Sequence, residues 1–241
     1  QRLELIFHED SYGYRPQKSA LDAVAKARVR CWEQDWVIDL DIKGFFDNIP
    51  HDLLMKAVRN HCQEKWILLY IERWLVAPLE NEKGEIVRRT KGVPQGSVIG
   101  PLLANLYLHY GMDMWLVKYY PNCNFERYAD DAIIHCGSEY QAREVKAQLE
   151  LRMQACGLEL HSEKTKIVYC KDSNRRGAPT EHIKFDFLGY TFKPRRAQNS
   201  IRKVWFTNWL PVVSKKAMKT MNERMKHMGI FRTSDSTLTD L

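Results

Sequence analysis

The sequence predicts an α+β protein, in which strands and helices are mixed along the chain, and three stretches carry this expectation. Residues 125–136 hold two short apolar runs on either side of Asp130 and Asp131, a pattern typical of a β-hairpin. Residues 36–42 form a β-branched run, which predicts a buried strand. Residues 98–119 form a long apolar segment, which predicts a helix.

The paired acids of the hairpin have two interpretations. Adjacent carboxylates repel each other, so Asp130 and Asp131 favour a cation as partner. A hard divalent cation, which prefers oxygen ligands, would be such a partner. Alternatively, the two acids mark a solvated turn, since Asp is a common turn residue. Taken alone, the dipeptide favours the turn, because short motifs discriminate weakly.

Two further acids lie on the strand predicted over 36–42. Asp39 and Asp41 are two residues apart, so their side chains share one face of a regular strand. The strand ends near Asp41, because a turn containing Gly44 follows. We therefore expect Asp41 to reach a functional site and Asp39 to be a structural acid.

The segment before the long helix has an unusual backbone. Gly92, Pro94 and Gly96 constrain its path immediately ahead of the helix. A glycine-bearing turn at a helix N-terminus lets the backbone of another molecule approach closely. Gln95 carries both a donor and an acceptor, which suit the edge of a base or a sugar.

The charge of the chain favours a polyanionic partner. Its 241 residues include 37 Lys and Arg against 30 Asp and Glu, a net charge of +7. Cations and aromatic rings are interleaved in the C-terminal third, at Lys193, Arg195, Arg196, Arg202 and Lys203 and at Tyr190, Phe192, Trp205, Phe206 and Trp209. Cations for phosphates and rings for bases predict a nucleic-acid track. The alternative is a solvated basic face above core aromatics.

An irregular loop over residues 8–16 contains a further cation with two interpretations. Arg15 is suited to hold a phosphate or a base, and an ion pair with Asp10 fits the spacing equally well. The RNA-binding candidates are therefore Arg15, Arg195, Arg196 and Lys203.

Apolar periodicity and turn residues predict the remaining elements. These are helices over 19–31, 52–58, 64–76, 139–156 and 214–228, strands over 158–160 and 165–169, and a hairpin over 186–192. In the helix over 64–76, the residues Trp66, Tyr70 and Trp74 recur at four-residue spacing and are expected in the core.

The sequence also indicates the cellular setting. No run of 18 apolar residues occurs and no signal peptide pattern opens the chain, so we expect no membrane association. The six cysteines form no Cys-x-x-Cys pair, which favours free thiols in a reducing cytosol and a cytoplasmic location. The first residue is Gln1 rather than Met, which suggests a cut or processed chain.

The order of these motifs closely resembles reverse transcriptases, most of all the group II intron-encoded kind, also called maturases. Six motifs carry the resemblance, namely residues 11–16 (Ser-Tyr-Gly-Tyr-Arg-Pro), 41–49 (Asp-Ile-Lys-Gly-Phe-Phe-Asp-Asn-Ile), 92–96 (Gly-Val-Pro-Gln-Gly), 103–107 (Leu-Ala-Asn-Leu-Tyr), 128–131 (Tyr-Ala-Asp-Asp) and 187–190 (Phe-Leu-Gly-Tyr). The resemblance spans almost the whole chain. It shifts the interpretation of the acids from a turn to a metal site.

The family implies a palm fold, an antiparallel sheet backed by helices. By this resemblance, residues 1–35 are part of the fingers and residues 36–200 form the palm, with fingers helices inserted over about 51–90. Residues 201–241 begin the thumb. Further fingers strands would precede Gln1, and the chain departs from the family pattern at Ser97 and Gly100.

The family also implies magnesium-dependent copying of RNA into DNA. Asp41, Asp130 and Asp131 match its three metal-binding acids, and the backbone carbonyl of Ile42 would add a ligand for two Mg²⁺ ions. The implied partners are an RNA template or intron RNA, a DNA primer and a deoxynucleoside triphosphate (dNTP). Whether the chain forms a dimer is left open.

The resemblance assigns further residues around the acids. Phe46 matches the bulky residue that would collide with a ribose 2′-hydroxyl, and Gln95 and Gly96 would lie along the template and the incoming nucleotide. Lys164, preferred over Lys166, would face the triphosphate. The primer grip would be Phe187, Leu188, Gly189 and Tyr190.

Three other functions compete with this interpretation. A splicing cofactor that binds RNA without polymerase activity would use the basic C-terminal third. An RNA-copying RNA polymerase conflicts with Phe46, which excludes ribonucleotides. A nucleotide cyclase could share the palm, but it would need neither the turn at 94–96 nor the basic aromatic segment.

Overall fold

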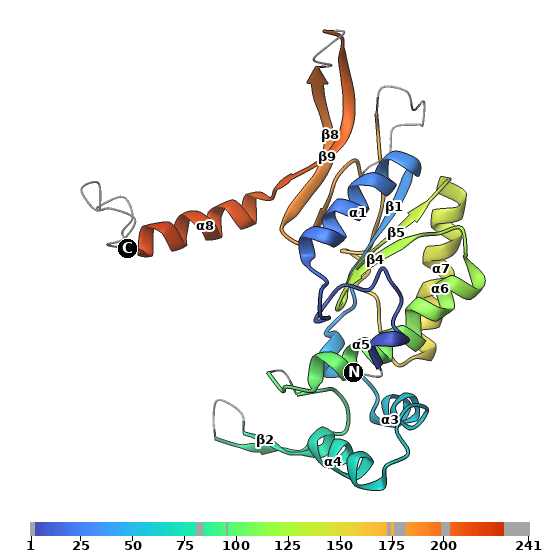
Figure 1. The fold of residues 1–241 in the computed structure, drawn as a ribbon, viewed down its shortest axis with the longest axis vertical. Coiled ribbons are helices and arrows are strands. Elements are labelled where there is room, and N and C mark those ends of the chain that lie inside the picture. The colour runs from blue at the N-terminus through green and yellow to red at the C-terminus, as the bar shows by residue number, and fades with distance from the viewer. Residues whose placement is uncertain are drawn as a thin grey trace.

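The computed structural model of the protein describes residues 3–80, 84–94, 96–172, 175, 182–198 and 203–228. A short 3₁₀ helix, η1 (Leu3–Leu5), opens the described part of the chain. The body contains a central sheet (Figure 1). At one end lie α4 (Lys65–Val76) and β2 (Leu79–Glu80), and at the other lie the paired strands β8 (Tyr190–Gln198) and β9 (Trp205–Val213).

The central sheet has four antiparallel strands in the order β4-β5-β1-β6. They are β1 (Trp36–Leu40), β4 (Phe125–Tyr128), β5 (Asp131–Cys136) and β6 (Lys166–Tyr169). In the middle of the sheet, Trp36 of β1 pairs with Cys136 on one side and with Tyr169 on the other. The hairpin predicted over 125–136 is β4 and β5, so that prediction is confirmed.

Each face of the sheet is covered by a helix. On one face, α7 (Glu139–Ala155) shares the larger core with Ile38 and Leu40 of β1. On the other face, α1 (Ala20–Glu33) shares a second core with Val37. Ser19 and Asp22 form a capping box that starts α1 where the sequence predicts a helix.

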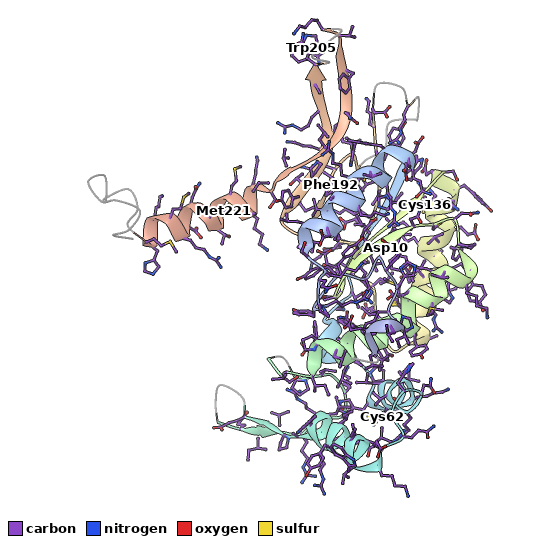
Figure 2. All side chains as sticks on the ribbon, in the orientation of Figure 1. Asp10, Cys62, Cys136, Phe192, Trp205 and Met221 are labelled. Carbon is purple, nitrogen blue, oxygen red and sulfur yellow. The ribbon has the colours of Figure 1, made fainter. Side chains whose placement is uncertain are left out.

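A second antiparallel sheet completes the second core. It contains β7 (Phe185–Phe187), β8 (Tyr190–Gln198) and β9 (Trp205–Val213), and Phe192 and Trp209 are fully buried in it. The β8–β9 hairpin projects from the body, with Trp205 at its free end and Phe192 at its base (Figure 2). Helix α8 (Lys215–His227) then extends away from the body (Figure 1).

At the opposite end, α3 (His51–Arg59) packs against α4 (Lys65–Val76), which leads into the short pair β2 (Leu79–Glu80) and β3 (Ile86–Val87). The expectation that the aromatic residues of α4 are core is wrong, because Trp66 is 63% exposed and Tyr70 and Trp74 are about half exposed. The buried side chains of α4 are Ile71 and Leu75.

The long helix predicted over 98–119 is present in three parts. These are α5 (Gly100–Leu108), a π-helical turn η2 (His109–Asp113) and α6 (Met114–Tyr119). Such π-helical turns inside helices are often associated with functional sites. Among the described helices, none combines the length and the apolarity that crossing a membrane requires.

Candidate active site

Strands β1 and β5 bring Asp41 and Asp131 to one edge of the central sheet. The last paired residues of the two strands are Leu40 and Ala132. Asp41 follows Leu40, and Asp131 precedes Ala132. Because side chains alternate along a strand, both carboxylates point to the face of Val37, towards the second sheet. They line the same cavity.

The third acid lies in the turn that joins β4 to β5. Ala129 has a φ of +57°, in the left-handed region, and Asp130 follows it. Burial raises the pKa of Asp130, and the charge of Asp41 adds to the increase. A backbone hydrogen bond and the Arg127 guanidinium oppose it. The mutual repulsion predicted from the Asp-Asp pair therefore extends to Asp41.

The predicted primer-grip residues reach Asp131. The backbone N–H of Leu188, in the turn between β7 and β8, donates a hydrogen bond to the Asp131 carboxylate. Burial nevertheless raises the pKa of Asp131 to about 7, with further increases from Asp130 and Asp41. Phe187 is buried beside this turn, and Tyr190 packs on the second core.

Asp39 lies at the same site, which the sequence interpretation missed. Its pKa is raised to about 7, first by burial and then by the charge of Asp131, against the opposing charge of Lys166. Asp39 also lines the cavity. Its two-residue spacing from Asp41 was the available signal, since it places both acids on one face.

Lys164 contacts the candidate metal acid Asp41. The Lys164 Nζ lies 3.4 Å from Asp41 Oδ2, and both side chains are partly exposed. The loop that carries Lys164 is anchored on Asp41, because the backbone N–H of His161 donates to the Asp41 carbonyl at 2.8 Å. Thr165 Oγ1 lies 3.3 Å from the same carbonyl and from the Asp41 nitrogen.

The cavity that these residues line has a volume of about 1090 Å³ and lies between the two sheets and α8. Its acids are Asp39, Asp41, Asp131 and Asp186. Its cations are Lys164, Lys166, Lys184, Lys193, Arg195, Lys215 and Lys216. Acids with cations around them suit a ligand that carries phosphate groups beside metal ions.

The remaining predicted substrate contacts lie near the start of α2 (Phe45–Asn48). Phe46 is half-buried, and its carbonyl accepts a 2.7 Å hydrogen bond from the Val93 N–H. This bond places the turn at 92–96 beside Phe46. Gly96 has a φ of +81° and open space where a side chain would start. Gln95 lies outside the described residues.

Ile42 is buried and pairs with Leu160, so its side chain anchors the end of β1 in the core. The metal ligand predicted at Ile42 is the backbone carbonyl, and burial of the side chain does not affect this prediction.

The four RNA-binding candidates differ in their surroundings. The Arg15 guanidinium is turned into its own loop, where Nε donates to Glu4 Oε2 at 2.9 Å and Nη1 donates to the carbonyls of His8 and Ser11. Its side chain is 8% exposed, so this arrangement does not support RNA binding by Arg15. Arg195, Arg196 and Lys203 are exposed.

The donor chemistry of the site fits a hard cation. Asp41, Asp130 and Asp131 offer carboxylate oxygens whose repulsion a cation would relieve. Within the described residues, no three acidic, His or Cys side chains are already arranged as a metal site. The cation nearest to Asp41 is instead the ammonium of Lys164.

A comparison with protein families identifies the class. Residues 1–192 match the family described as reverse transcriptase (RNA-dependent DNA polymerase). Because this match covers well over half of the 241 residues, the chain belongs to the reverse transcriptase family.

Curated relatives include intron-encoded proteins, as the motifs predict. The COX1/OXI3 intron 1 protein of Saccharomyces cerevisiae is 26% identical over 75% of this chain and 26% of its own length. Protein YkfC of Escherichia coli is 28% identical over 81% of this chain and 58% of its own length. The group II intron-encoded protein LtrA of Lactococcus lactis subsp. cremoris is 36% identical over 44% of this chain and 18% of its own length. The chain thus spans between about a fifth and three fifths of these relatives.

Solved structures confirm the predicted fold. Apo telomerase from Candida tropicalis, truncated from its C-terminal domain, superposes with a TM-score of 0.59 over 85% of this chain and 44% of its own length. A telomerase from Candida albicans in complex with a fragment of telomeric RNA gives a TM-score of 0.57 over 76% of this chain and 33% of its own length. At 16% and 14% identity, these likenesses concern the fold alone.

Proposed function

We propose that the chain is the palm-containing part of an RNA-directed DNA polymerase of the group II intron type. The convergence of Asp41 and Asp131 from separate strands, with Asp130 in the adjoining turn, is the observation that carries this proposal. Convergent carboxylates beside a cation-lined cavity suit nucleotidyl transfer.

The proposal gives each side chain a role. Asp41, Asp130 and Asp131, with the Ile42 carbonyl, would hold two Mg²⁺ ions, which would supply activation of the primer 3′-hydroxyl and charge stabilisation of the leaving pyrophosphate. Lys164 would contact the triphosphate, and the turn at 187–190 would position the end of the primer. The side chain of Phe46 would limit the space at the sugar 2′ position.

The proposed partners are an RNA template or intron RNA, a DNA primer and dNTPs. The net charge of +7 and the exposed cations of the β8–β9 hairpin support a polyanionic partner. A cytosolic location is part of the proposal and is supported by the six cysteines, all of which are free thiols.

Primer extension on an RNA template, with Mg²⁺ and dNTPs, tests the proposal on this chain. We expect incorporation that Asp131→Asn and Asp130→Ala each reduce by at least about a hundredfold, as loss of charge stabilisation at a reacting centre does. Glu159→Gln is the matched control, because Glu159 is an exposed acid just before the loop that carries Lys164. Activity that survives Asp130→Ala would remove that residue from the site.

A splicing cofactor without polymerase activity is the second candidate. The exposed Arg195, Arg196 and Lys203 on and beside the projecting hairpin favour it. Tight binding of intron RNA by this chain, unaffected by Asp131→Ala and without dNTP incorporation, would select this candidate over the first.

A further inference from the structure

We propose that the N-terminal loop, residues 8–15, is a clamp that sets the backbone geometry of the catalytic turn 128–131. Gly13 and Arg127 are its positioning residues. The importance of this turn for catalysis rests on the proposed function, whereas the clamp itself rests on contacts among buried groups.

The loop is bonded directly to the strand that leads into the turn. The Tyr12 N–H donates to the Arg127 carbonyl at 2.7 Å, and the Arg127 N–H donates to the Asp10 carbonyl at 2.9 Å. Ser11 thereby forms a parallel bridge with Arg127. Since β4 is an edge strand of the central sheet, the loop covers that edge.

Gly13 touches the turn itself. A Cβ atom at this position would lie 2.4 Å from the Ala129 nitrogen and 3.0 Å from the Tyr128 carbonyl carbon. Both atoms belong to the backbone, so neither can swing aside as a flexible side chain would. Only a glycine lets the loop approach the turn this closely.

The Arg127 side chain connects the loop, the turn and the long helix. It is fully buried, and each of its five N–H groups has a partner. The acceptors are both Asp113 carboxylate oxygens, Asn105 Oδ1, Ser11 Oγ and the Ala129 carbonyl, at distances of 2.6–3.0 Å.

Asn105 closes this network, because its Nδ2 donates to the Gly13 carbonyl at 2.7 Å. Gly13 and Ala129 are therefore held by the same Asn105–Arg127 pair.

The clamp accounts for the strained conformation of Ala129. A non-glycine residue with a φ of +57° persists only where its surroundings enforce it. Here, Arg127 fixes the Ala129 carbonyl and Gly13 packs against its nitrogen. Because Asp130 and Asp131 follow directly, the direction of both carboxylates depends on this residue.

Gly13→Ala tests the clamp, because Gly13 has an ordinary φ and the substitution adds bulk alone. Gly137→Ala is the matched control, since a Cβ there would meet only Gln141 Oε1, at 3.8 Å. Both variants are made in the full chain. Each is compared with wild type by thermal unfolding, amide hydrogen exchange over 125–136, Mn²⁺ affinity by electron paramagnetic resonance, and primer extension.

We expect Gly13→Ala to fold, to exchange the amides of 128–131 faster and to bind Mn²⁺ about tenfold more weakly. We also expect kcat to fall at least tenfold with an unchanged KM for dNTP, since small displacements of reacting groups have such effects. Gly137→Ala should match wild type. Exchange and Mn²⁺ affinity that match wild type in Gly13→Ala would overturn the clamp.

A second variant covers the case in which Gly13→Ala fails to fold. Ser11→Ala removes one acceptor of Arg127 without adding bulk, and we expect faster exchange in the turn. Unchanged exchange in this variant would overturn the clamp. If wild type neither extends primers nor binds Mn²⁺, the proposed function fails, and amide exchange alone decides on the clamp.

Discussion

The ammonium of Lys164 lies 3.4 Å from Asp41 Oδ2, at the carboxylate that the chain would offer to a metal ion. Lys164 is 61% and Asp41 is 39% exposed at the side chain, so water screens their attraction. A divalent cation at Asp41 would compete with this ammonium. Lys164 would then be released towards a phosphate group in the same cavity.

Lys164→Ala should therefore separate stability from function. We expect the free energy of unfolding to change by less than about 0.5 kcal/mol, as for other exposed ion pairs. Divalent cations should bind more tightly, because a competing cation is gone. The KM for dNTP should rise about tenfold or more, since a charge-assisted phosphate contact is lost. Urea unfolding, Mn²⁺ titration and primer extension measure the three effects.

Lys43→Ala is the control for this prediction. Lys43 forms an ion pair with Glu159 at the same distance of 3.4 Å and is two residues from Asp41. The Lys43→Ala variant should leave both the Mn²⁺ affinity and the KM for dNTP unchanged. Equal effects of the two variants would mean that Lys164 acts through the general charge of the surface.

The buried acids predict how stability depends on pH. The pKa values of Asp39 and Asp131 are raised to about 7 in the folded chain from an ordinary 3.8. Between these values, the folded state holds protons that the unfolded state has lost. The stability contributed by the neutral carboxyls is complete below pH 3.8 and is lost as the pH rises through 7. Each group contributes at most about 1.4 kcal/mol per pH unit in this window.

Asp131→Asn should flatten the free energy of unfolding between pH 5 and 8 and raise it at pH 8. Chemical denaturation at several pH values measures this. Mg²⁺ should stabilise wild type more at pH 8 than at pH 5. Asp22→Asn should leave the slope unchanged in this window, because hydrogen bonds from Ser19 hold the pKa of Asp22 below its usual range. A wild-type stability that rises from pH 5 to 8 in step with that of Asp131→Asn would contradict the assignment.

Local sequence patterns were sufficient for several elements. The caps at Ser19, Ser138 and Ser214 start helices where the sequence predicts them, because a side-chain oxygen satisfies a free backbone N–H nearby. The β4–β5 hairpin likewise follows from two apolar runs around a polar turn. The convergence of Asp41 and Asp131 depends on a register between strands ninety residues apart, so only the family resemblance could indicate it.

The sequence predictions differ from the structure where contacts between distant parts of the chain determine the position of a side chain. The periodicity of α4 shows which side chains share a face, but whether another element covers that face is a tertiary property, and Trp66 is exposed. Arg15 pairs with Glu4, eleven residues away, rather than with Asp10, whose partner is Arg30. The two-residue spacing of Asp39 from Asp41 indicates that both acids share one face of the strand, but the cavity on that face also requires the second sheet, whose placement is a tertiary property.

Phe46 predicts the choice between deoxyribonucleotides and ribonucleotides. We expect Phe46→Ala to incorporate ribonucleotides at least about tenfold better relative to deoxyribonucleotides, because it opens the space that a 2′-hydroxyl would occupy. Single-nucleotide primer extension with each substrate measures the ratio, and Phe46→Tyr is the control that keeps the bulk. Since Phe46 packs partly on the core, some loss of stability is expected and is measured by thermal unfolding. A wild type that prefers ribonucleotides would instead identify an RNA polymerase.

Arg195 and Arg196 allow a matched comparison of two faces of the β8–β9 hairpin. Arg195 and Arg196 are consecutive residues of β8, where they pair with Asn208 and Thr207 of β9. Because successive side chains of a strand alternate, the two side chains point to opposite faces of the hairpin. Arg195 lines the cavity that contains the acids, whereas Arg196 does not. Each alanine variant should weaken binding of a single-stranded RNA and reduce the salt slope of that binding by about one.

The two variants should differ in their effect on nucleotide addition. We expect Arg195→Ala to lower primer-extension rates at saturating RNA, because its guanidinium shares the cavity of Asp41 and Asp131. Arg196→Ala should lower RNA affinity alone. Fluorescence anisotropy across a salt series and primer extension at saturating template separate the two effects. Identical profiles for both variants would show that the cavity face and the outer face of the hairpin contact RNA in the same way. Arg195 would then be no part of the proposed polymerase site.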